Sequence, residues 1–379
     1  MALLKGSVAI VQRVAPHYRH AFYRGLHAEL ENHGIELEVY YGSERPGTVP
    51  RTVILTEPWA HLVTNKYIVI GGRDIVWQRL PFLCSYNLVI VEHAARILNN
   101  YSLLTAHRLG LIRKLAFWGH GGNFQQGKSR PVAELIKSIV ARQADHYFAY
   151  TELSRQRVSA SGVPDERITV VNNTIDTAAL TEALDSITST DLTRLRARHG
   201  LHGEHVAIYC GGLYPEKRID FLIKSVLVVR QRICDFELII IGDGPDADIV
   251  RNASAEHRWI KYIGPKFGSD VAPYYRLSRC ILMPYLVGLV IIDSFTAELP
   301  LITTDHDTHG PEIAYLKNNI NGLMVTPTIG EYAGAVVSCL SDDKHLKRLQ
   351  EGCRDSASEL ALDNMIKKYT EGILLCMKH

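Results

Sequence analysis

The stretch HVAIYCGGLYPEKRIDFLI, residues 205–223, carries the pattern that decides the fold: an apolar strand, a pair of glycines, and a helix opened by a Lys-Arg pair. Glycines after a strand let backbone N–H groups approach an anion, and a helix N-terminus also favours negative charge. Gly211 and Gly212 with Lys217 and Arg218 therefore suit a diphosphate. A tight turn followed by a solvated Lys-Arg pair explains the same residues equally well.

Short apolar runs of this kind alternate with longer amphipathic segments along the whole chain. In the first half they are SVAIVQRV, IELEVYYG, YNLVIVEHA, LAFWGHG, HYFAYT and ITVVNN, and in the second half HVAIYCGG, FELIIIGDG, IKYIG, RCILMPY, LPLITTD and NGLMV. The alternation predicts parallel sheets covered by helices. Two such sets in series predict an α/β protein with two Rossmann-like domains.

The polar, Ser/Thr-rich stretch that follows the last strand of the first set predicts the domain boundary. We assign residues 1–172 to an N-terminal domain and residues 173–360 to a C-terminal domain. At 379 residues the chain is too long for one ordinary core, which agrees with this division.

Composition excludes several classes of protein. Lys and Arg number 42 against 40 Asp and Glu, so the net charge of +2 gives no reason to expect nucleic-acid binding. Seven cysteines without C-x-x-C spacing predict neither a disulfide framework nor a zinc site, and a cytoplasmic location is expected. No metal is expected at the D-x-D triplets 246–248 and 305–307, because loop acids of this kind are common.

Ligands of open α/β sheets bind at the carboxyl ends of the strands, so residues at those ends are the site candidates. In the second half, Gly288, Leu289 and Val290 precede a helical pattern whose first turns carry Asp293 and Ser294. An acid in that place can accept hydrogen bonds from ribose hydroxyls. The alternative is that Asp293 only complements the helix dipole.

The first half offers candidates for the acceptor side. His120 lies between glycines in AFWGHGGNFQ and is able to bind a sugar hydroxyl or a phosphate oxygen. His17, Tyr18 and Arg19 open the first helix, where a phosphate or an acceptor sugar fits as well as plain solvent. Glu92 could serve an acceptor hydroxyl, although a capped strand end explains it equally well.

The blocks GGLYPEKRIDFLI, ELIIIGDGP, IKYIG, GLVIIDSFTAELPLITT and NINGLMV follow one another in the order and spacing of the retaining glycosyltransferases of family 4. The chain resembles that family over nearly its whole length. The resemblance implies the GT-B fold, in which two Rossmann-like domains face each other across a cleft. It also implies that the final helix, residues 361–379, packs back on the N-terminal domain.

The resemblance further implies the reaction: transfer of a sugar, with retention, from a nucleotide diphosphate sugar to a glycan, a lipid-linked acceptor or another hydroxyl. Surface polysaccharide or glycoconjugate assembly is the implied setting. Similar enzymes work without a metal, so the nucleotide sugar is the only small molecule expected beside the acceptor.

Individual roles follow from the resemblance. Lys217 matches the lysine that binds the diphosphate, Asp293 takes the place of the Glu that holds the ribose, and His120 matches the histidine that contacts the transferred sugar. The N–H groups of residues 288–290 would meet the donor's phosphate or sugar. Lys266 lies where the main chain of the family borders the base.

Two family positions differ in this chain. Gly212 stands where the family commonly has Arg, with Arg218, Arg13 or Arg19 as the expected substitute. The first Glu of the E-x7-E pattern has no counterpart, since Tyr285 lies eight residues before Asp293. These departures leave two alternatives open: a non-catalytic GT-B binding or partner subunit, and a nucleotide-sugar epimerase of the same architecture.

The stretch AHRLGLIRKLAFW, residues 106–118, mixes basic with apolar residues. It suggests a peripheral contact with the inner face of a membrane, where lipid-linked acceptors reside. A solvated helix face is the other interpretation.

Overall fold

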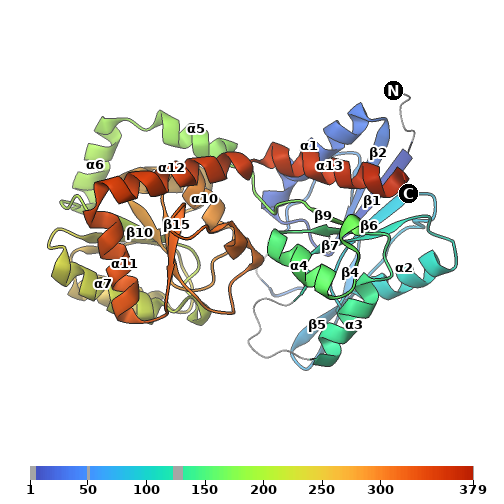
Figure 1. Cartoon of the computed structure of the whole chain (residues 1–379), viewed down its shortest axis with the longest axis horizontal. Helices are drawn as coiled ribbons and strands as arrows, with labels where there is room; N and C mark the ends of the chain where they lie inside the picture. Colours follow the sequence, from blue (N-terminus) through green and yellow to red (C-terminus); the bar gives the residue numbers. More distant parts are fainter. Residues whose placement is uncertain (1–5, 49–51, 123–130, 379) are drawn as a thin grey trace. The chain divides into compact units, whose positions relative to one another are not determined.

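The computed structural model describes residues 6–48, 52–122 and 131–378. It divides into two compact units: unit 1 is Met1–Asp176 with Leu362–His379, and unit 2 is Thr177–Ala361 (Figure 1). The polar stretch predicts this division at residue 172, and the structure makes it at Asp176. Each unit is a parallel sheet covered by helices, so the predicted α/β class is confirmed.

Unit 1 is built on a seven-stranded parallel sheet whose strand order reverses between β1 and β6. In order across the sheet the strands are β3 (Ala60–Leu62), β2 (Ile35–Tyr41), β1 (Gly6–Gln12), β6 (Leu88–Glu92), β7 (Leu115–Gly119), β8 (His146–Ala149) and β9 (Ile168–Val170). Strands β7 and β8 are buried along their whole length because helices cover both faces of the sheet.

The helices of unit 1 in the described ranges are α1 (His20–Asn32), α2 (Asn99–Arg108), α3 (Pro131–Ala141), α4 (Glu152–Ala160) and α13 (Leu362–Lys378). Helix α13 comes from the other end of the sequence and lies beside α1 (Figure 1). Its Tyr369 ring stacks on Phe148 of β8 at a centroid distance of 4.4 Å. The last helix therefore completes the core of unit 1.

Unit 2 contains a six-stranded parallel sheet with the strand order typical of dinucleotide-binding folds. The strands, in order, are β12 (Ile260–Gly264), β11 (Glu237–Ile241), β10 (Val206–Cys210), β13 (Cys280–Leu282), β14 (Leu301–Thr304) and β15 (Gly322–Val325). The helices are α5 (Ala178–Ser186), α6 (Ser189–His199), α7 (Ile219–Arg232), α8 (Ala247–Glu256), α9 (Ala272–Leu277), α10 (Val290–Thr296), α11 (Ile329–Ser341) and α12 (Asp343–Glu359). Every apolar run predicted as a strand, in either half, is a strand of these two sheets.

The sequence analysis missed a hairpin in unit 1. Strands β4 (Asn65–Ile70) and β5 (Arg73–Gln78) pair antiparallel and form a separate two-stranded sheet. Gly71 and Gly72 join them with φ angles of 55° and 73°, the left-handed values that a tight hairpin turn requires. The residues around the Gly-Gly pair are apolar on consecutive positions, so the alternation that marks a half-buried strand is absent.

The stretch 106–118 does not form a basic amphipathic helix. Its first residues end α2, Leu109 and Leu111 are exposed in the following loop, and Leu115 onward is the buried strand β7. Across the described ranges, no helix combines the length and the apolar character that crossing a bilayer requires.

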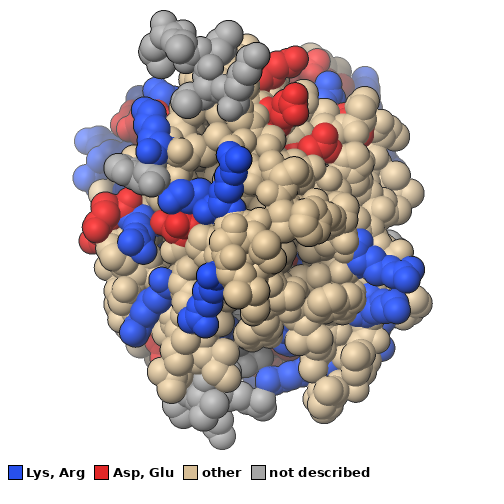
Figure 2. All heavy atoms as spheres, turned by 90° about the vertical axis from the view of Figure 1, so that its right-hand side faces the viewer, with Lys and Arg blue, Asp and Glu red and all other residues tan. Residues whose placement is uncertain are grey.

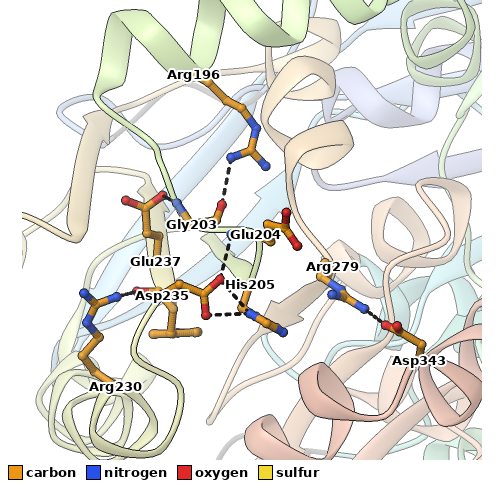
Figure 3. Close-up of polar contacts among 10 residues, drawn as sticks. Arg196, Gly203, Glu204, His205, Arg230, Asp235, Glu237, Arg279 and Asp343 are labelled. Atoms are coloured by element: carbon orange, nitrogen blue, oxygen red, sulfur yellow. Dashed lines mark hydrogen bonds and ion pairs between the residues drawn. The ribbon is translucent and has the colours of Figure 1, made fainter.

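Carboxylates hold the amino-terminal edge of the unit 2 sheet (Figure 3). Glu237, buried at the start of β11, accepts hydrogen bonds from the N–H groups of His202 and Gly203 at 3.0 and 3.1 Å. Asp235 accepts from the N–H of Glu204 at 3.0 Å and contacts Nδ1 of His205 at 2.8 Å. The polar groups at this edge are thus satisfied within the protein.

We expect Glu237→Ala to lower the free energy of unfolding by on the order of 1–3 kcal/mol, because it leaves backbone donors without their acceptor. The midpoint of urea unfolding measures this. Glu204→Ala is the matched control, since that side chain is exposed and only its N–H takes part in the network. Equal midpoints for the two variants would contradict the structural role of Glu237.

Candidate functional site

The strand order of unit 2 reverses between β10 and β13, and open α/β sheets bind ligands at the carboxyl ends of strands beside such a reversal. Three segments leave the sheet there: the glycine loop after β10, the loop after β11, and the loop before α10. Most residues predicted to hold the donor lie on the first and the third of these segments or in the helical turns that follow them, whereas Lys266 follows β12.

The glycine loop, residues 211–213, packs directly against the end of β11 and the loop that follows it. The N–H of Gly211 donates to the carbonyl of Ile241 at 3.0 Å, and that of Leu213 to Asp243 at 2.9 Å. A Cβ atom at Gly242 would lie 1.9 Å from the Gly211 oxygen, so only glycine permits this packing. Residues 241–244, the IGDG run, therefore hold the glycine loop in place, a role that the sequence alone did not indicate.

This packing changes which amide is available. The Gly211 N–H is used within the fold, whereas the Gly212 N–H has no hydrogen-bond partner in the described part of the chain. Gly212 therefore presents the donor that the sequence analysis placed at both glycines.

Lys217 is a buried cation, only 8% exposed. Its Nζ donates to the carbonyl of Leu286 and lies 3.8 Å from the sulfur of Met283. No carboxylate of the described residues pairs with it. Burial lowers the pKa of Lys217 to about 8. An ammonium withdrawn from water without a counter-charge is well suited to an anionic ligand.

The loop between β13 and α10, which contains Leu286, also carries amides without an acceptor among the described residues. Within the described residues, the N–H groups of Gly288, Leu289 and Val290 have no hydrogen-bond acceptor. Leu286 adopts a φ of 40°, which is unusual for a residue with a branched side chain. Lys217 therefore contacts the loop that supplies the predicted main-chain donors.

His309, which the sequence analysis did not single out, fixes this loop. It is 4% exposed, its Nδ1 accepts from the Val287 N–H at 3.2 Å, and its Nε2 donates to the Thr304 carbonyl at 2.7 Å. Burial lowers the pKa of His309, in keeping with a neutral ring. Its place just after β14, a carboxyl strand end, was the signal that could have revealed it.

Asp293 lies on α10, half-buried, and its side chain makes no hydrogen bond with the described residues. Burial raises the pKa of Asp293 to about 7. Its charge also contributes to the raised pKa of the Cys210 thiol, which burial brings to about 11. Asp293 therefore lies near the end of β10, where the glycine loop begins.

Other predicted donor-side residues behave differently. Ser294 is completely buried, and its hydroxyl donates to the Leu299 carbonyl, so its prediction as a ligand contact is wrong. Arg218 is exposed; it lies 5.1 Å from the Tyr285 ring centroid and its Nε donates to Asp220 at 3.3 Å. Lys266 follows β12 and is half-buried.

Tyr285 occupies the position of the missing first Glu. Its ring stacks on His306 at a centroid distance of 4.3 Å and meets Phe221 edge-on at 5.8 Å. An aromatic contact thus replaces a carboxylate at this point.

In unit 1, Arg19 is a buried cation as well, at 3% exposed. Its guanidinium donates to Asn173 and lies 4.9 Å from the ring centroid of Trp118 and 5.5 Å from that of Tyr150. No carboxylate of the described residues pairs with it. Arg19 is therefore held inside unit 1 among aromatic rings, and its role as a substitute phosphate cation stays a prediction.

His120 follows β7 and is exposed, with its ring packed edge-on against Tyr150 at 4.4 Å. Desolvation where the ring packs, followed by the charges of Arg19 and Lys137, lowers the pKa of His120 to about 4. The imidazole is therefore neutral at neutral pH. The motif that contains it continues into residues 123–125, which lie outside the described residues.

The remaining unit 1 candidates are His17, Tyr18 and Glu92. His17 is exposed and Tyr18 half-buried, with their rings 5.7 Å apart. The Glu92 carboxylate accepts from the Arg13 N–H at 3.3 Å, which ties β6 to the chain after β1. Glu92 therefore has a structural contact of its own.

Residues of the two D-x-D triplets do not gather into a cluster. Within the described ranges no group of three or more His, Cys, Asp or Glu side chains is placed to hold a metal ion. Metal-independent chemistry stays a prediction.

Residues 22–179 match the family described as Glycosyltransferase Family 4, and residues 204–342 match the family described as Glycosyl transferases group 1. Together these matches span most of both units. The chain therefore belongs to the glycosyltransferases of family 4, and the expected GT-B architecture is confirmed.

Individual relatives are distant. The chain is 24% identical to an alpha-D-kanosaminyltransferase of Streptomyces kanamyceticus, over 58% of each chain. It is 25% identical to a GDP-mannose-dependent alpha-(1-6)-phosphatidylinositol monomannoside mannosyltransferase of Mycolicibacterium smegmatis, over 55% of this chain and 48% of that one. The chain thus spans about half the length of these curated relatives.

A solved structure shares the fold over the whole chain. HepE of Anabaena, crystallised with UDP, superposes with a TM-score of 0.68 at 13% identity and covers 97% of this chain and 99% of its own. The likeness extends through both units.

The burial of Lys217 leads to a prediction on stability. Its pKa falls from 10.5 to about 8 on folding, so the unfolded chain binds more protons between those values. Below about pH 8 the buried charge opposes folding by on the order of 3 kcal/mol. Lys217→Met is therefore expected to raise the melting temperature at pH 7, by about 2–4 °C for each kcal/mol recovered.

Melting temperature as a function of pH measures this. Wild-type stability should rise between about pH 8 and 10.5 and the variant should lack that rise. Lys224→Met, an exposed lysine on α7, is the control and should change little. A variant that melts below wild type at pH 7 would show that Lys217 stabilises the fold instead.

Proposed function

We propose that the chain transfers a sugar from a nucleotide diphosphate sugar to a hydroxyl acceptor, with unit 2 holding the donor. The observation that carries the proposal is the buried Lys217 ammonium, which has no carboxylate partner in the described part of the chain. It contacts the loop that leads to residues 288–290, whose amides have no acceptor there either. A diphosphate offers the negative charge and the acceptor oxygens that both require. Asp293 would accept hydrogen bonds from the ribose hydroxyls.

The relatives support this donor class. HepE was solved with UDP, and the mycobacterial mannosyltransferase uses GDP-mannose. One relative transfers a kanosaminyl group, and the other transfers mannose to a phosphatidylinositol monomannoside, which is a lipid-linked acceptor. We propose a glycan or lipid-linked acceptor for this chain, in surface polysaccharide or glycoconjugate assembly.

In the proposed reaction, the bond between the sugar's anomeric carbon and the diphosphate oxygen breaks, and the acceptor oxygen bonds to the same carbon. Negative charge grows on the departing diphosphate. Fixed donors at Lys217, Gly212 and residues 288–290 would stabilise that charge more than the ground state. These groups would supply the charge stabilisation that a metal gives elsewhere, so we infer a metal-independent enzyme.

Retention of configuration is part of the proposal. The acceptor would enter on the face that the diphosphate leaves, and its proton would pass to the departing diphosphate oxygen. No side-chain nucleophile is then needed. His120, neutral at working pH, would hold a hydroxyl of the transferred sugar.

The paired pKa values predict a narrow pH range for donor binding. Asp293 must be ionised, which requires a pH above about 7, and Lys217 must be protonated, which requires a pH below about 8. Affinity for a nucleotide diphosphate sugar should be highest between these values and fall by up to about tenfold per pH unit outside them. Calorimetric titration across pH 5.5 to 9.5 (a range of about four units) measures it.

Two variants test which residue causes the fall in donor affinity at low pH and which causes the fall at high pH. Asp293→Asn should remove the acid limb, and Lys217→Arg should carry the alkaline limb beyond the measured range because arginine stays protonated. A flat profile for the wild type would contradict the proposed roles of both residues.

Lys217→Ala tests the reaction itself. Loss of one charged hydrogen bond to the diphosphate should reduce transfer by roughly ten- to a hundredfold or more, with the fold intact. The donor for the assay would come from a thermal-shift screen of UDP-, GDP- and dTDP-sugars, since a bound donor raises the melting temperature. Lys224→Ala, which removes an exposed cation of α7 outside the predicted site, is the control. Turnover near wild type in Lys217→Ala would refute the assignment.

The same assay separates the two alternatives. Gly212 and Tyr285, where the family has Arg and Glu, are the observations in their favour. A non-catalytic partner subunit would bind donor without hydrolysing it. An epimerase would convert donor without acceptor and release no nucleoside diphosphate.

A further inference from the structure

The β4–β5 hairpin of unit 1 exposes an apolar face that the proposed transfer does not use. Residues directly opposite each other in an antiparallel pair lie on the same face, and here the pairs are Lys66 with Trp77, Ile68 with Ile75, and Ile70 with Arg73. The side chains of Ile68, Ile70 and Trp77 are 56%, 61% and 41% exposed. Four apolar side chains thus share one outward face with a cation at each end.

The opposite face anchors the hairpin to unit 1. Val76 and Gln78 are each 1% exposed, and Gln78 exchanges hydrogen bonds of 2.7 and 2.9 Å with the Asn99 side chain. Tyr67 donates to the Ser43 carbonyl at 2.7 Å. The hairpin is therefore held in place with its apolar face outward.

The tip is apolar on both faces. Val69, on the anchored face, is 49% exposed beside the glycine turn, next to Ile68 and Ile70 on the outward face. A flat partner would cover one face only, whereas insertion of the tip into a soft apolar medium would bury both. The boundary between lipid headgroups and acyl chains is such a medium.

The charges around the face have one sign. Lys66, Arg73 and the exposed Arg79 form no ion pair with the described residues. The single acid of the hairpin, Asp74, lies on the anchored face and pairs with Arg45 at 3.1 Å. Figure 2 shows a face of the molecule where Lys and Arg flank a broad area without charge, while most Asp and Glu lie toward the top and left.

We propose that the outward face and tip of the β4–β5 hairpin bind the surface of an anionic lipid bilayer. Ile68, Ile70 and Val69 would enter the headgroup boundary, and Trp77 would lie at its level, where Trp is favoured. Lys66 and Arg73 would meet the lipid phosphates. This docking goes beyond the transfer reaction and stands without it.

Vesicle flotation with the full chain tests the proposal. Wild type should bind vesicles of phosphatidylcholine with phosphatidylglycerol on the order of tenfold more tightly than phosphatidylcholine alone, and added salt should weaken that binding. Ile68→Ser with Ile70→Ser should weaken it by on the order of tenfold, and Lys66→Gln with Arg73→Gln should remove the preference for the anionic lipid. Both double variants should keep the wild-type melting temperature and donor affinity.

The matched control is Ile249→Ser with Ile320→Ser, which removes exposed isoleucines of unit 2 and should leave vesicle binding unchanged. Wild type that fails to bind anionic vesicles would overturn the proposal. So would equal binding by the hairpin variants and the control. A dimer in light scattering that Ile68→Ser with Ile70→Ser dissolves, without vesicle binding, would assign the face to a second copy of the chain.

Discussion

The Lys217 ammonium is buried in unit 2 with a main-chain carbonyl as its hydrogen-bond acceptor, and the surrounding loops are built to keep it there. Leu286 takes a left-handed conformation to offer that carbonyl, and His309 holds the next residue of the loop through a neutral ring. A carboxylate in this place would satisfy the charge and leave none for a ligand. The unpaired cation is thus the constraint on which the donor half of the site depends.

The two edges of the unit 2 sheet differ in whether their polar groups have hydrogen-bond partners within the protein. At the amino-terminal edge, Asp235 and Glu237 satisfy the backbone donors of the preceding loop. At the carboxyl edge, the amides of Gly212 and residues 288–290 have no acceptor, and the Asp293 carboxylate has no donor, among the residues that the structure describes. Stability therefore resides at one edge and binding capacity at the other, a separation that the parallel arrangement of the strands makes possible.

Much of this could be predicted from sequence because each buried strand is a continuous apolar run and each expected site residue follows such a run. Lys217 and Asp293 are predicted as site residues because each follows the carboxyl end of a strand. Contacts that depend on packing could not be found this way: the Ser294 hydroxyl is used by Leu299, and the Gly211 amide by Ile241. Arg19 reads as a solvated cation in sequence, yet rings of residues distant in the chain enclose it.

Helix α13 bears on how the chain reaches its native state during synthesis. Met365, Tyr369 and Ile373 form part of the unit 1 core, yet a ribosome makes them after all of unit 2. Unit 2 is continuous in sequence, so all of its strands and helices are made before α13. Unit 1 is synthesised first, but the part of its core that α13 covers stays exposed until α13 has been made.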